Sequence, residues 1–276
     1  MKDKLVSVVV QAYNSADTIC DTLDSIKKQS YANIEIIISD DKSTDNTLDI
    51  VQKWIKENES TNIKVITTER NTGIPGNNNR ALKEVNGEYV EFLAADDLLM
   101  PTAIEKMLLY CEKYKNVVPI TRVRLFSDKN MKMENVQKYC MNCYEFAQMD
   151  HRRQYRQLLK QNQIVAPAAS FYPTRLLRKI GGFDESFKCF EDYPINLKIL
   201  KYDYCFGFLD EELIQYRISP KSLTGSDLTP IKKDEIKLFW KVRFINMFRV
   251  GMGWEAIKQA KSWVILARKI KRGKIC

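Results

Sequence analysis

Two short apolar segments constrain the fold of this chain most. They read LVSVVV at residues 5–10 and IEIIIS at residues 34–39, and both are rich in β-branched side chains. Runs of this kind, in which polar residues do not alternate with apolar ones, are typical of strands buried on both faces of a parallel sheet. Residues 15–28 lie between them, begin with capping residues and repeat apolar residues at helical spacing. This order predicts a βαβ unit.

The same alternation continues along the chain. The sequence predicts a helix over residues 44–57, a strand over 63–67, a helix over 77–85 and a strand over 89–93. Strands that alternate with helices in this way predict a doubly wound α/β sheet with helices on both faces. In such sheets ligands bind beyond the carboxyl ends of the strands, so polar residues at those ends are the first candidates for a site.

Two adjacent carboxylates, Asp96 and Asp97, follow the strand predicted at residues 89–93, within the sequence FLAADD. An ionised carboxylate beside an apolar strand is costly unless a cation, hydrogen-bond donors or water compensate its charge. A divalent metal ion is one such partner. The alternative is a solvated turn that caps the following helix, with Pro101 in the first turn of that helix. The dipeptide alone leaves both interpretations open.

The positive charge of the chain is concentrated near its C-terminal end. The formal net charge is +9, and residues 231–276 hold thirteen Lys and Arg against three Asp and Glu. This local net charge of +10 leaves −1 for the first 230 residues. One basic tail on a nearly neutral body predicts a localised contact with anions, including membrane phosphates. It argues against a nucleic-acid-binding protein, which would be basic more uniformly.

Several common sites are excluded by missing motifs. The first βα turn reads QAYNSAD and lacks the GxGxxG of a dinucleotide site, and no Walker motif is present. The pair Cys140 and Cys143 is not followed by a second pair, and His151 is the only histidine, which argues against structural zinc. Seven scattered cysteines fit reduced thiols better than disulfides.

The sequence shows neither a cleavable signal nor a membrane-spanning run, and this predicts a cytosolic chain. The sequence MKDKLVSVVV enters strand-like residues directly, without the pattern of a cleavable signal. Its apolar runs all fall well short of the roughly 20 residues that span a bilayer.

Three stretches, taken in order, resemble the family 2 glycosyltransferases of the GT-A fold. They read SVVVQAYNSADTICDTLDSIKKQSYANIEIIISDDKSTDNT, NTGIPGNNNRALKEVNGEYVEFLAADDLLMP and GGFDESFKCFEDYPINLKI, and the resemblance spans roughly residues 4–224. The resemblance implies an inverting enzyme that moves one sugar from a nucleotide-diphosphate donor, commonly a UDP-sugar, to an acceptor hydroxyl with Mg²⁺ or Mn²⁺.

The resemblance also implies a division of the chain. Residues 1–230 are expected to form a GT-A catalytic domain, a doubly wound mixed sheet flanked by helices. Within it, residues 1–110 would bind the nucleotide-sugar, and residues 111–230 would bind the acceptor and carry the catalytic residue. Residues 231–276 would form a basic amphipathic helical extension.

For the acidic motif, the resemblance assigns Asp97 to the metal ion and Asp96 to the ribose or diphosphate of the donor. A hard divalent cation held by carboxylate oxygens would neutralise the charge that develops on a leaving diphosphate. Many relatives carry a further acid where this chain has Ala94 or Ala95. We therefore expect phosphate oxygens and water to complete the metal's coordination.

The nucleotide base is assigned to the first two strand ends. Gln11, Ala12 and Tyr13 match the family's segment around the base, and Asp41 matches an acid that accepts a base N–H. Alternatives from the residues themselves stay open. Tyr13 is equally consistent with an aromatic ring that covers the core, and Asp41 with an N-cap of the helix that follows.

The donor diphosphate has a weaker match. Asn79 lies where relatives often show the second residue of an Arg-Asn pair, and Asn78 stands in the Arg position. Asn79 is therefore a candidate donor-binding residue. The replacement of Arg by Asn78 beside it puts a contact with the diphosphate in doubt.

The catalytic base is assigned by resemblance to the acid pair Glu191 and Asp192, in which Asp192 would remove the proton of the acceptor hydroxyl. The alternative is that the pair caps the following helix. Downstream, YRISPKSLTG resembles the family's closing loop, in which a histidine often completes the metal site. That position is Ser219 here, so either metal binding is weaker or Arg217 and Lys221 take over part of the charge neutralisation.

The C-terminal extension has a pattern of its own. Residues 236–272 interleave aromatic and aliphatic side chains with Lys and Arg. Such a helix lies in the interfacial plane of a membrane, or its apolar stripe packs on the catalytic domain. Membrane attachment would suit relatives that extend polyprenyl-diphosphate-linked glycans in O-antigen or capsule synthesis. The competing hypothesis is a nucleotide-sugar-binding scaffold without turnover.

Overall fold

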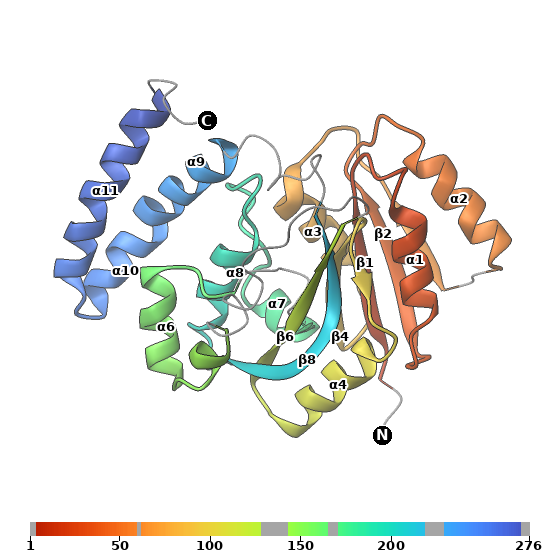
Figure 1. Cartoon of the computed structure of the whole chain (residues 1–276), viewed down its shortest axis with the longest axis horizontal. Helices are drawn as coiled ribbons and strands as arrows, with labels where there is room; N and C mark the ends of the chain where they lie inside the picture. The colour runs from red at the N-terminus through yellow and green to blue at the C-terminus, as the bar shows by residue number, and fades with distance from the viewer. Residues whose placement is uncertain (1–3, 60–61, 128–142, 165–170, 219–228, 272–276) are drawn as a thin grey trace.

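The computed structural model describes residues 4–59, 62–127, 143–164, 171–218 and 229–271 (Figure 1). Within them the larger sheet has five strands: β3 (Ile63–Ile66), β2 (Ile34–Asp40), β1 (Val6–Ala12), β4 (Tyr89–Ala94) and β7 (Phe171–Pro173), in that spatial order. The first four strands run parallel, and β7 pairs antiparallel with β4. The carboxyl ends of β1, β2 and β4 therefore meet at one edge of the sheet.

Helices cover both faces of this sheet (Figure 1). One face carries α1 (Ile19–Lys27), α2 (Thr47–Glu57) and α4 (Ala103–Lys113), and the other carries α3 (Gly73–Glu84), α7 (Thr174–Lys179) and α8 (Asp192–Ile199). Strand β1 shows the reason: Val8 and Val10 are buried against the first set, and Val9 against the second. The doubly wound α/β fold predicted from the sequence is confirmed.

A smaller sheet extends the fold beyond β4. It comprises β5 (Leu98–Leu99), β8 (Cys205–Arg217) and β6 (Val117–Phe126), with β8 antiparallel to β5 and parallel to β6. Because β5 follows β4 closely, the pairing of Leu98 with Gln215 brings the end of β8 to the carboxyl end of β4. Helix α6 (His151–Lys160) is joined to this sheet by two hydrogen bonds between Gln154 and the backbone of Phe206 (2.7 and 2.8 Å).

The C-terminal segment forms α9 (Thr229–Leu238), the π-helix η2 (Phe239–Arg243), α10 (Phe244–Arg249) and α11 (Gly253–Lys271). Its inner face contributes Leu238, Phe239 and Met247 to the same core cluster as α3, α7 and α8. This part of the extension therefore shares the core that lies on that face of the main sheet. None of the described helices is both long and apolar enough to cross a bilayer.

Helix α1 begins at Ile19, four residues after the predicted start. The chain first turns, because the N–H groups of Ser15 and Ala16 donate to Thr47 Oγ1 (2.8 Å) and Asp45 Oδ2 (3.2 Å) of the neighbouring β2–α2 connection. Of the cysteine pair considered for zinc, Cys143 is described and buried, whereas Cys140 lies outside the described part of the chain.

Candidate active site

The acid pair lies in the turn between β4 and β5. Asp97 is only 2% exposed, and its Oδ1 accepts the backbone N–H of Arg217 at 2.9 Å. Burial, and then the neighbouring Asp96, raise the pKa of Asp97 well above its usual range. The helix that follows, α4, has Thr102 at its N-cap, so the two acids do not cap it. The pair instead faces the end of β8.

Arg217 is the cation beside this pair. Its side chain is buried, with Nε donating to Asp96 O (2.9 Å), Nη2 donating to Asp21 Oδ2 (2.9 Å) and the guanidinium 4.6 Å from the centre of the Phe126 ring. The resemblance to known sequences had suggested a charge-neutralising role for Arg217, and the structure places it against both acids. Asp21 was missed, because in the sequence it reads as one polar position of an amphipathic helix.

The donor set of this site fits a hard divalent cation. Asp96 and Asp97 supply carboxylate oxygens, which Mg²⁺ and Mn²⁺ prefer. Within the described residues no group of three or more His, Cys, Asp or Glu side chains converges to hold a metal ion. Any such ion would therefore depend on donor phosphates and water for most of its ligands. Ser219 and Lys221 lie outside the described residues.

The first strand end presents an accessible aromatic ring. Gln11 and Ala12 are the last residues of β1, and Tyr13 follows them with half of its side chain exposed (50%). The Tyr13 ring therefore lies at the open edge of the sheet and does not cover the core. A planar base can stack on a ring in this position.

Asp41 is buried in a network of hydrogen bonds. Its oxygens accept from Thr72 N (2.9 Å), Thr72 Oγ1 (2.6 Å), Gly73 N (2.8 Å) and Arg80 Nη2 (3.1 Å). This carboxylate supplies partners for the first N–H groups of α3, which explains why that helix begins at Gly73, four residues before the predicted residue 77. Asp41 therefore serves the start of α3, whereas the sequence alternative had assigned it to the helix that follows it, α2.

Asn79 joins α3 to the turn at residues 181–183. Its Oδ1 accepts from Phe183 N (2.8 Å), and its Nδ2 donates to Phe183 O (3.0 Å) and Glu185 Oε1 (2.8 Å). Both polar atoms of its amide thus hold α3 against this turn. Asn78, its neighbour, is buried, and its amide atoms have no hydrogen-bond partner among the described residues.

Glu191 and Asp192 lie at the start of α8, and both are buried. Asp192 Oδ2 accepts from Asn162 Nδ2 at 3.2 Å. Burial raises the pKa of both carboxyls, and the proximity of Asp192 raises that of Glu191 further. Asp192 is therefore the member of the pair that ionises first, and an ionised, buried carboxylate near neutral pH is suited to accept a proton.

Comparison with known proteins decides the family. The sequence profile described as Glycosyl transferase family 2 matches residues 7–181, more than half of the chain. The chain belongs to glycosyl transferase family 2.

Relatives and solved structures agree with this family assignment. The family 2 chain is 42% identical over 114 residues to the Escherichia coli UDP-Glc:alpha-D-GlcNAc-diphosphoundecaprenol beta-1,3-glucosyltransferase WfaP, a match that covers 41% of this chain and 43% of the relative. It is similar in structure to S. aureus TarS 1-349 in complex with UDP-GlcNAc (TM-score 0.66, 21% identity, 88% of this chain and 67% of that one). It is also similar to the mannosyltransferase PcManGT from Pyrobaculum calidifontis in complex with GDP-Man and Mn²⁺ (TM-score 0.68, 17% identity, 96% and 75%).

The comparisons support the fold more directly than the roles of the site residues. The GT-A fold expected from the family resemblance is confirmed by the similarity to these two transferase structures. The matched residues 7–181 include Asp96 and Asp97 but end before Asp192 and Arg217. The roles of the individual site residues therefore remain predictions.

Proposed function

We propose that this family 2 chain is an inverting glycosyltransferase that moves a sugar from a UDP-sugar to a hydroxyl of a polyprenyl-diphosphate-linked glycan, in the synthesis of a cell-surface polysaccharide such as O-antigen or capsule. The observation that carries the proposal is the acid pair Asp96 and Asp97, of which Asp97 is buried, with Arg217 against it at the strand edge where α/β sheets bind ligands. The printed activity of the Escherichia coli relative supports the choice of donor and acceptor.

Asp192 is the proposed general base. As the acceptor oxygen forms its bond to the anomeric carbon, the hydroxyl proton passes to the Asp192 carboxylate and the bond between that carbon and the donor's phosphate oxygen breaks. Attack from the face opposite the nucleotide diphosphate inverts the anomeric configuration. The hydrogen bond from Asn162 orients the Asp192 carboxylate, and burial keeps its basicity high.

The leaving diphosphate must be neutralised at the other end of the reacting bond. Asp97, with Asp96, would hold Mg²⁺ or Mn²⁺, and that ion when bound would offset the charge of the departing nucleoside diphosphate. Arg217 adds a buried positive charge at this position that does not depend on the metal ion. Preorganised charge of this kind lowers the barrier without reorganising during the reaction.

The nucleotide is proposed to lie along the ends of β1 and β2. Tyr13 would stack on the base, with Gln11 and Ala12 beside it. Asp41 would act through the loop that it organises, because four donors already share its carboxylate. Asn79 would likewise act by fixing α3 against residues 181–183.

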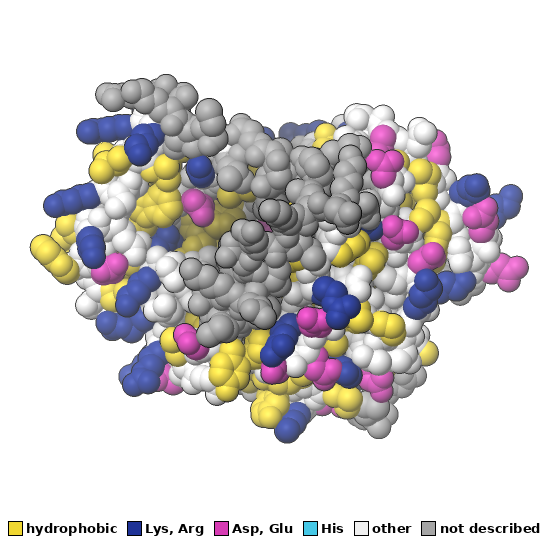
Figure 2. Space-filling model, viewed as in Figure 1, with side chains coloured by type: hydrophobic (Ala, Val, Ile, Leu, Met, Phe, Trp, Pro, Cys, Tyr) yellow, Lys and Arg dark blue, Asp and Glu magenta, His cyan; other side chains and the backbone are white. Residues whose placement is uncertain are grey.

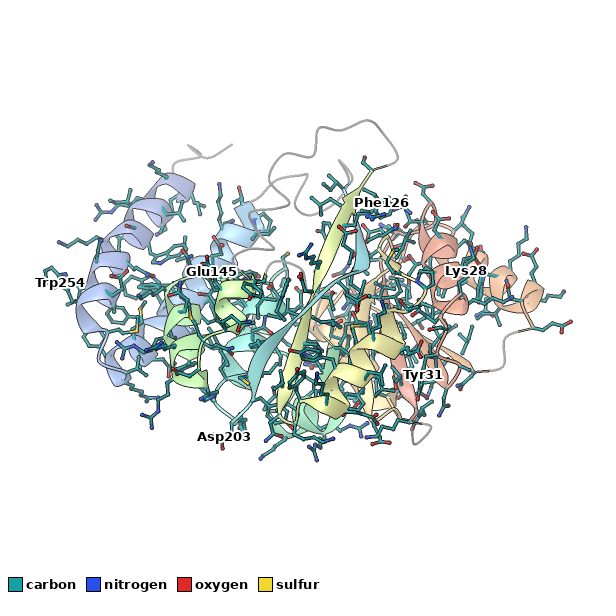
Figure 3. All side chains as sticks on the ribbon, turned by 60° about the horizontal axis from the view of Figure 1, so that its bottom comes forward. Lys28, Tyr31, Phe126, Glu145, Asp203 and Trp254 are labelled. Atoms are coloured by element: carbon teal, nitrogen blue, oxygen red, sulfur yellow. The ribbon has the colours of Figure 1, made fainter. Side chains whose placement is uncertain are left out.

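The outer face of the C-terminal helices is proposed to contact the cytoplasmic surface of a membrane. Large apolar side chains are exposed there, namely Trp240, Ile245, Phe248, Trp254, Ile257, Val264 and Ile265. Figure 2 shows apolar and basic side chains side by side on this part of the surface, and Figure 3 shows Trp254 projecting from it. Apolar side chains ringed by cations suit an interface of acyl chains and lipid phosphates.

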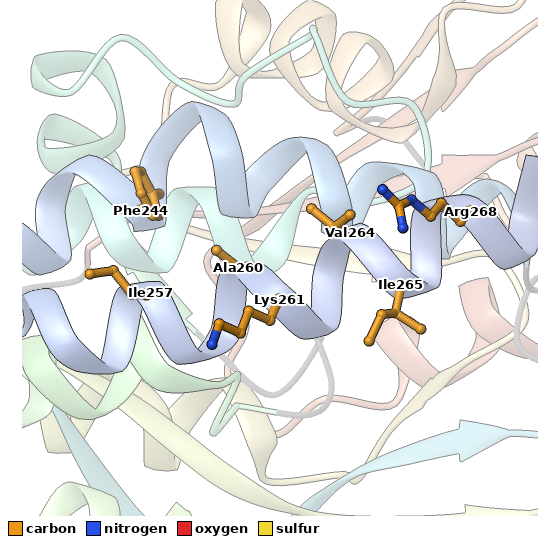
Figure 4. Close-up of a pocket in the computed structure, with 7 residues that line it drawn as sticks. All are labelled: Phe244, Ile257, Ala260, Lys261, Val264, Ile265 and Arg268. Carbon is orange, nitrogen blue, oxygen red and sulfur yellow. The ribbon is translucent and has the colours of Figure 1, made fainter.

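The same face includes a shallow groove between α10 and α11 (Figure 4). Phe244 forms one wall, and Ile257, Ala260, Val264 and Ile265 form the other, with the cations Lys261 and Arg268 at its border. A groove with an apolar lining and cations at its border is more favourably covered by an anionic lipid surface than exposed to water.

Calorimetry is the first test of the proposed function. UDP, GDP, dTDP and CMP would be titrated into the protein with Mn²⁺ and again with EDTA, using wild type and Asp97→Ala. We expect UDP to bind, and binding to weaken in EDTA and in the variant. UDP release from UDP-glucose and UDP-N-acetylglucosamine with a synthetic N-acetylglucosamine diphospholipid then tests transfer, with Asp192→Asn as the inactive control. Binding without turnover in any combination would favour the scaffold hypothesis.

A further inference from the structure

The end of α6 is held by a buried arginine from the C-terminal helices. Arg243, the last residue of η2, is 3% exposed, and its Nε donates to Leu159 O at 2.7 Å while Nη2 donates to Lys160 O and to Gln259 Oε1 (2.8 Å). The last carbonyls of a helix lack partners within the helix and carry partial negative charge. A guanidinium is therefore well suited to this position.

Aromatic rings surround the same guanidinium. Its central carbon lies 5.4 Å from the ring centre of Tyr193, 5.5 Å from that of Phe239 and 5.9 Å from that of Trp263. A buried cation is costly unless its donors and its charge are compensated. Here carbonyl oxygens compensate the donors and ring faces compensate the charge, so the position of Arg243 is strongly fixed.

The segment that Arg243 holds leads directly to the proposed base. Asn162 lies two residues beyond Lys160, and its Nδ2 donates to Asp192 Oδ2 at 3.2 Å. Tyr193, which follows Asp192, donates its hydroxyl hydrogen to Leu158 O in the same turn of α6. The end of α6 is thus bonded to Arg243 on one side and to Asp192 and Tyr193 on the other.

A second contact from the same extension holds the approach to α8. Asp234 Oδ2, on α9, accepts the backbone N–H groups of Lys188 (2.9 Å) and Cys189 (3.1 Å), just before Glu191. The neighbouring residue Glu235 raises the pKa of Asp192, after burial, and its own pKa is raised by burial. The C-terminal helices therefore contact both ends of the segment that carries the acid pair.

We infer that Arg243 is a positioning residue for Asp192, acting through the end of α6 and Asn162, and that the C-terminal extension completes the active site as well as contacting a membrane. The inference rests on the proposed role of Asp192 as base. It gives the extension a task in the chemical step that a membrane anchor alone would not have.

The test compares four single variants with wild type, adds the double variant Arg243→Met/Asn162→Ala, and keeps a fifth single variant in reserve. Arg243→Met keeps most of the side-chain volume and removes the donors, Arg243→Lys keeps the charge, and Asn162→Ala removes the last link. Arg249→Met is the matched control, because Arg249 is an exposed arginine on adjacent α10. Gln259→Met removes one acceptor of the guanidinium together with the hydrogen bond from Gln259 Nε2 to Lys160 O (3.2 Å), so it loosens the same end of α6 and replaces Arg243→Met if that variant does not fold.

The expected result is a selective loss in the chemical step. Arg243→Met and Asn162→Ala should each lower kcat on the order of 10- to 100-fold, with the KM of the UDP-sugar and the calorimetric affinity for UDP unchanged. Arg243→Lys should restore part of kcat, and Arg249→Met should match wild type. Because the two residues act in series, the double variant Arg243→Met/Asn162→Ala should lose no more than the worse single variant.

Two readouts separate positioning from a merely structural role. The acidic limb of kcat should move to higher pH in both variants, because the Asn162 hydrogen bond lowers the pKa of Asp192. Glu191, Glu235 and Tyr193 are the other titratable groups around Asp192, and Arg243 lies against Tyr193 and influences Glu235. Hydrogen exchange of folded Arg243→Met, measured without substrates, should accelerate at residues 159–164 and 189–193.

The outcomes that overturn each claim differ. Normal kcat and normal exchange in folded Arg243→Met would overturn the positioning inference, and so would additive losses in the double variant. Turnover retained by Asp192→Asn would instead overturn the proposed base.

Discussion

Arg217 donates its backbone N–H to the carboxylate of Asp97 at 2.9 Å, although the two residues are 120 positions apart in the sequence. The contact exists because β8 pairs with β5, which directly follows the acid pair. Two sequence motifs that resemble separate parts of a donor site are thereby joined in one network. The network includes an exposed partner, Asp21, which allows its buried and exposed parts to be tested separately.

Replacing Arg217 should impair the chemical step. Arg217→Met removes a buried cation beside the proposed leaving-group site, so we expect kcat to fall about 100-fold. Asp21→Asn is the matched control. It removes only the carboxylate of the ion pair with Arg217, and that carboxylate is largely exposed, so stability and kcat should change little. Steady-state kinetics of both variants, with urea unfolding of each, make the comparison; equal effects would contradict the assigned role.

Transfer should depend on the ionisation of Asp192. Burial raises the pKa of this carboxyl to about 6. A base must be ionised to accept a proton, so kcat should be low at pH 5 and should rise through about pH 6 toward a plateau. Asp192→Asn should lose this limb together with most of the turnover. A pH profile of kcat at saturating donor checks the prediction, and a flat profile between pH 5 and 7 in wild type would refute it.

Two buried glutamates of the main sheet should respond in opposite ways to replacement by methionine. Glu91 has no hydrogen-bond partner among the described residues, whereas Glu35 accepts from Ser7 Oγ, Asn86 N (2.6 Å) and Gly87 N (3.1 Å). Glu91→Met should raise the free energy of unfolding by about 1–3 kcal/mol at pH 7. Glu35→Met should lower it by about 2–4 kcal/mol, because its donors lose their acceptor. Urea unfolding measures both.

The gain in Glu91→Met should also depend on pH. Burial raises the pKa of Glu91 well above its usual range. A carboxyl with a raised folded-state pKa contributes stability that is fully present below its unfolded pKa of about 4.3 and is lost as pH rises toward the folded value. The advantage of the variant should therefore be small at pH 4 and should grow up to pH 7. Urea unfolding of wild type and Glu91→Met at pH 4 and pH 7 measures this difference. An equal gain in stability at both pH values would contradict the prediction, because it would mean that Glu91 is already ionised at pH 4.

The two glycines before Phe183 should differ in their tolerance of alanine. Both have positive φ, +76° for Gly181 and +63° for Gly182, so each substitution carries backbone strain of about 1 kcal/mol. A Cβ at Gly181 would meet no atom within 4 Å, but a Cβ at Gly182 would collide with Asn79 Oδ1. Gly182→Ala should therefore cost about 2 kcal/mol more than Gly181→Ala. Equal midpoints of urea unfolding would contradict the role of Asn79 in this turn.

The exposed apolar face should govern association with vesicles. Trp254 is 82% exposed, so Trp254→Ser should leave the fold intact and lower sedimentation with anionic phosphatidylglycerol vesicles several-fold. Tyr114→Ser is the control, because Tyr114 is exposed on the connection after α4, outside the C-terminal helices. Equal sedimentation of wild type and both variants would show that this face does not bind the membrane.

The strands and the acid pair were within reach of sequence reasoning because they depend on local patterns. The run at 6–10 is buried on both faces because, apart from the small Ser7, it is apolar throughout, with Val6, Val8 and Val10 on one face and Val9 on the other. Asp97 follows a strand end because the FLAADD motif contains the last residues of such a run. The helix predicted at 44–57 begins only three residues later, at Thr47.

Features that depend on distant residues could not be predicted. The start of α3 is set by Asp41, a carboxylate from the end of β2, and the end of α6 by Arg243, more than 80 residues further along the chain. In the sequence Arg243 is one cation among thirteen in a basic segment, and its burial follows only from packing. The π-helical turn and the antiparallel strand β7 carry no local signal either.

Helix α3 also determines how this family 2 chain can be recombined with its relatives. Its first turn is bonded to Asp41 and, through Ile74 N, to Lys188 O (3.0 Å), and Asn79 at its centre is bonded to Phe183. This one helix is thus bonded to residues 183 and 188, far along the chain, so a chimera cut near residue 110 would pair α3 with a foreign loop. Exchanging α3 together with residues 181–189 would instead keep these hydrogen bonds within one transferred unit.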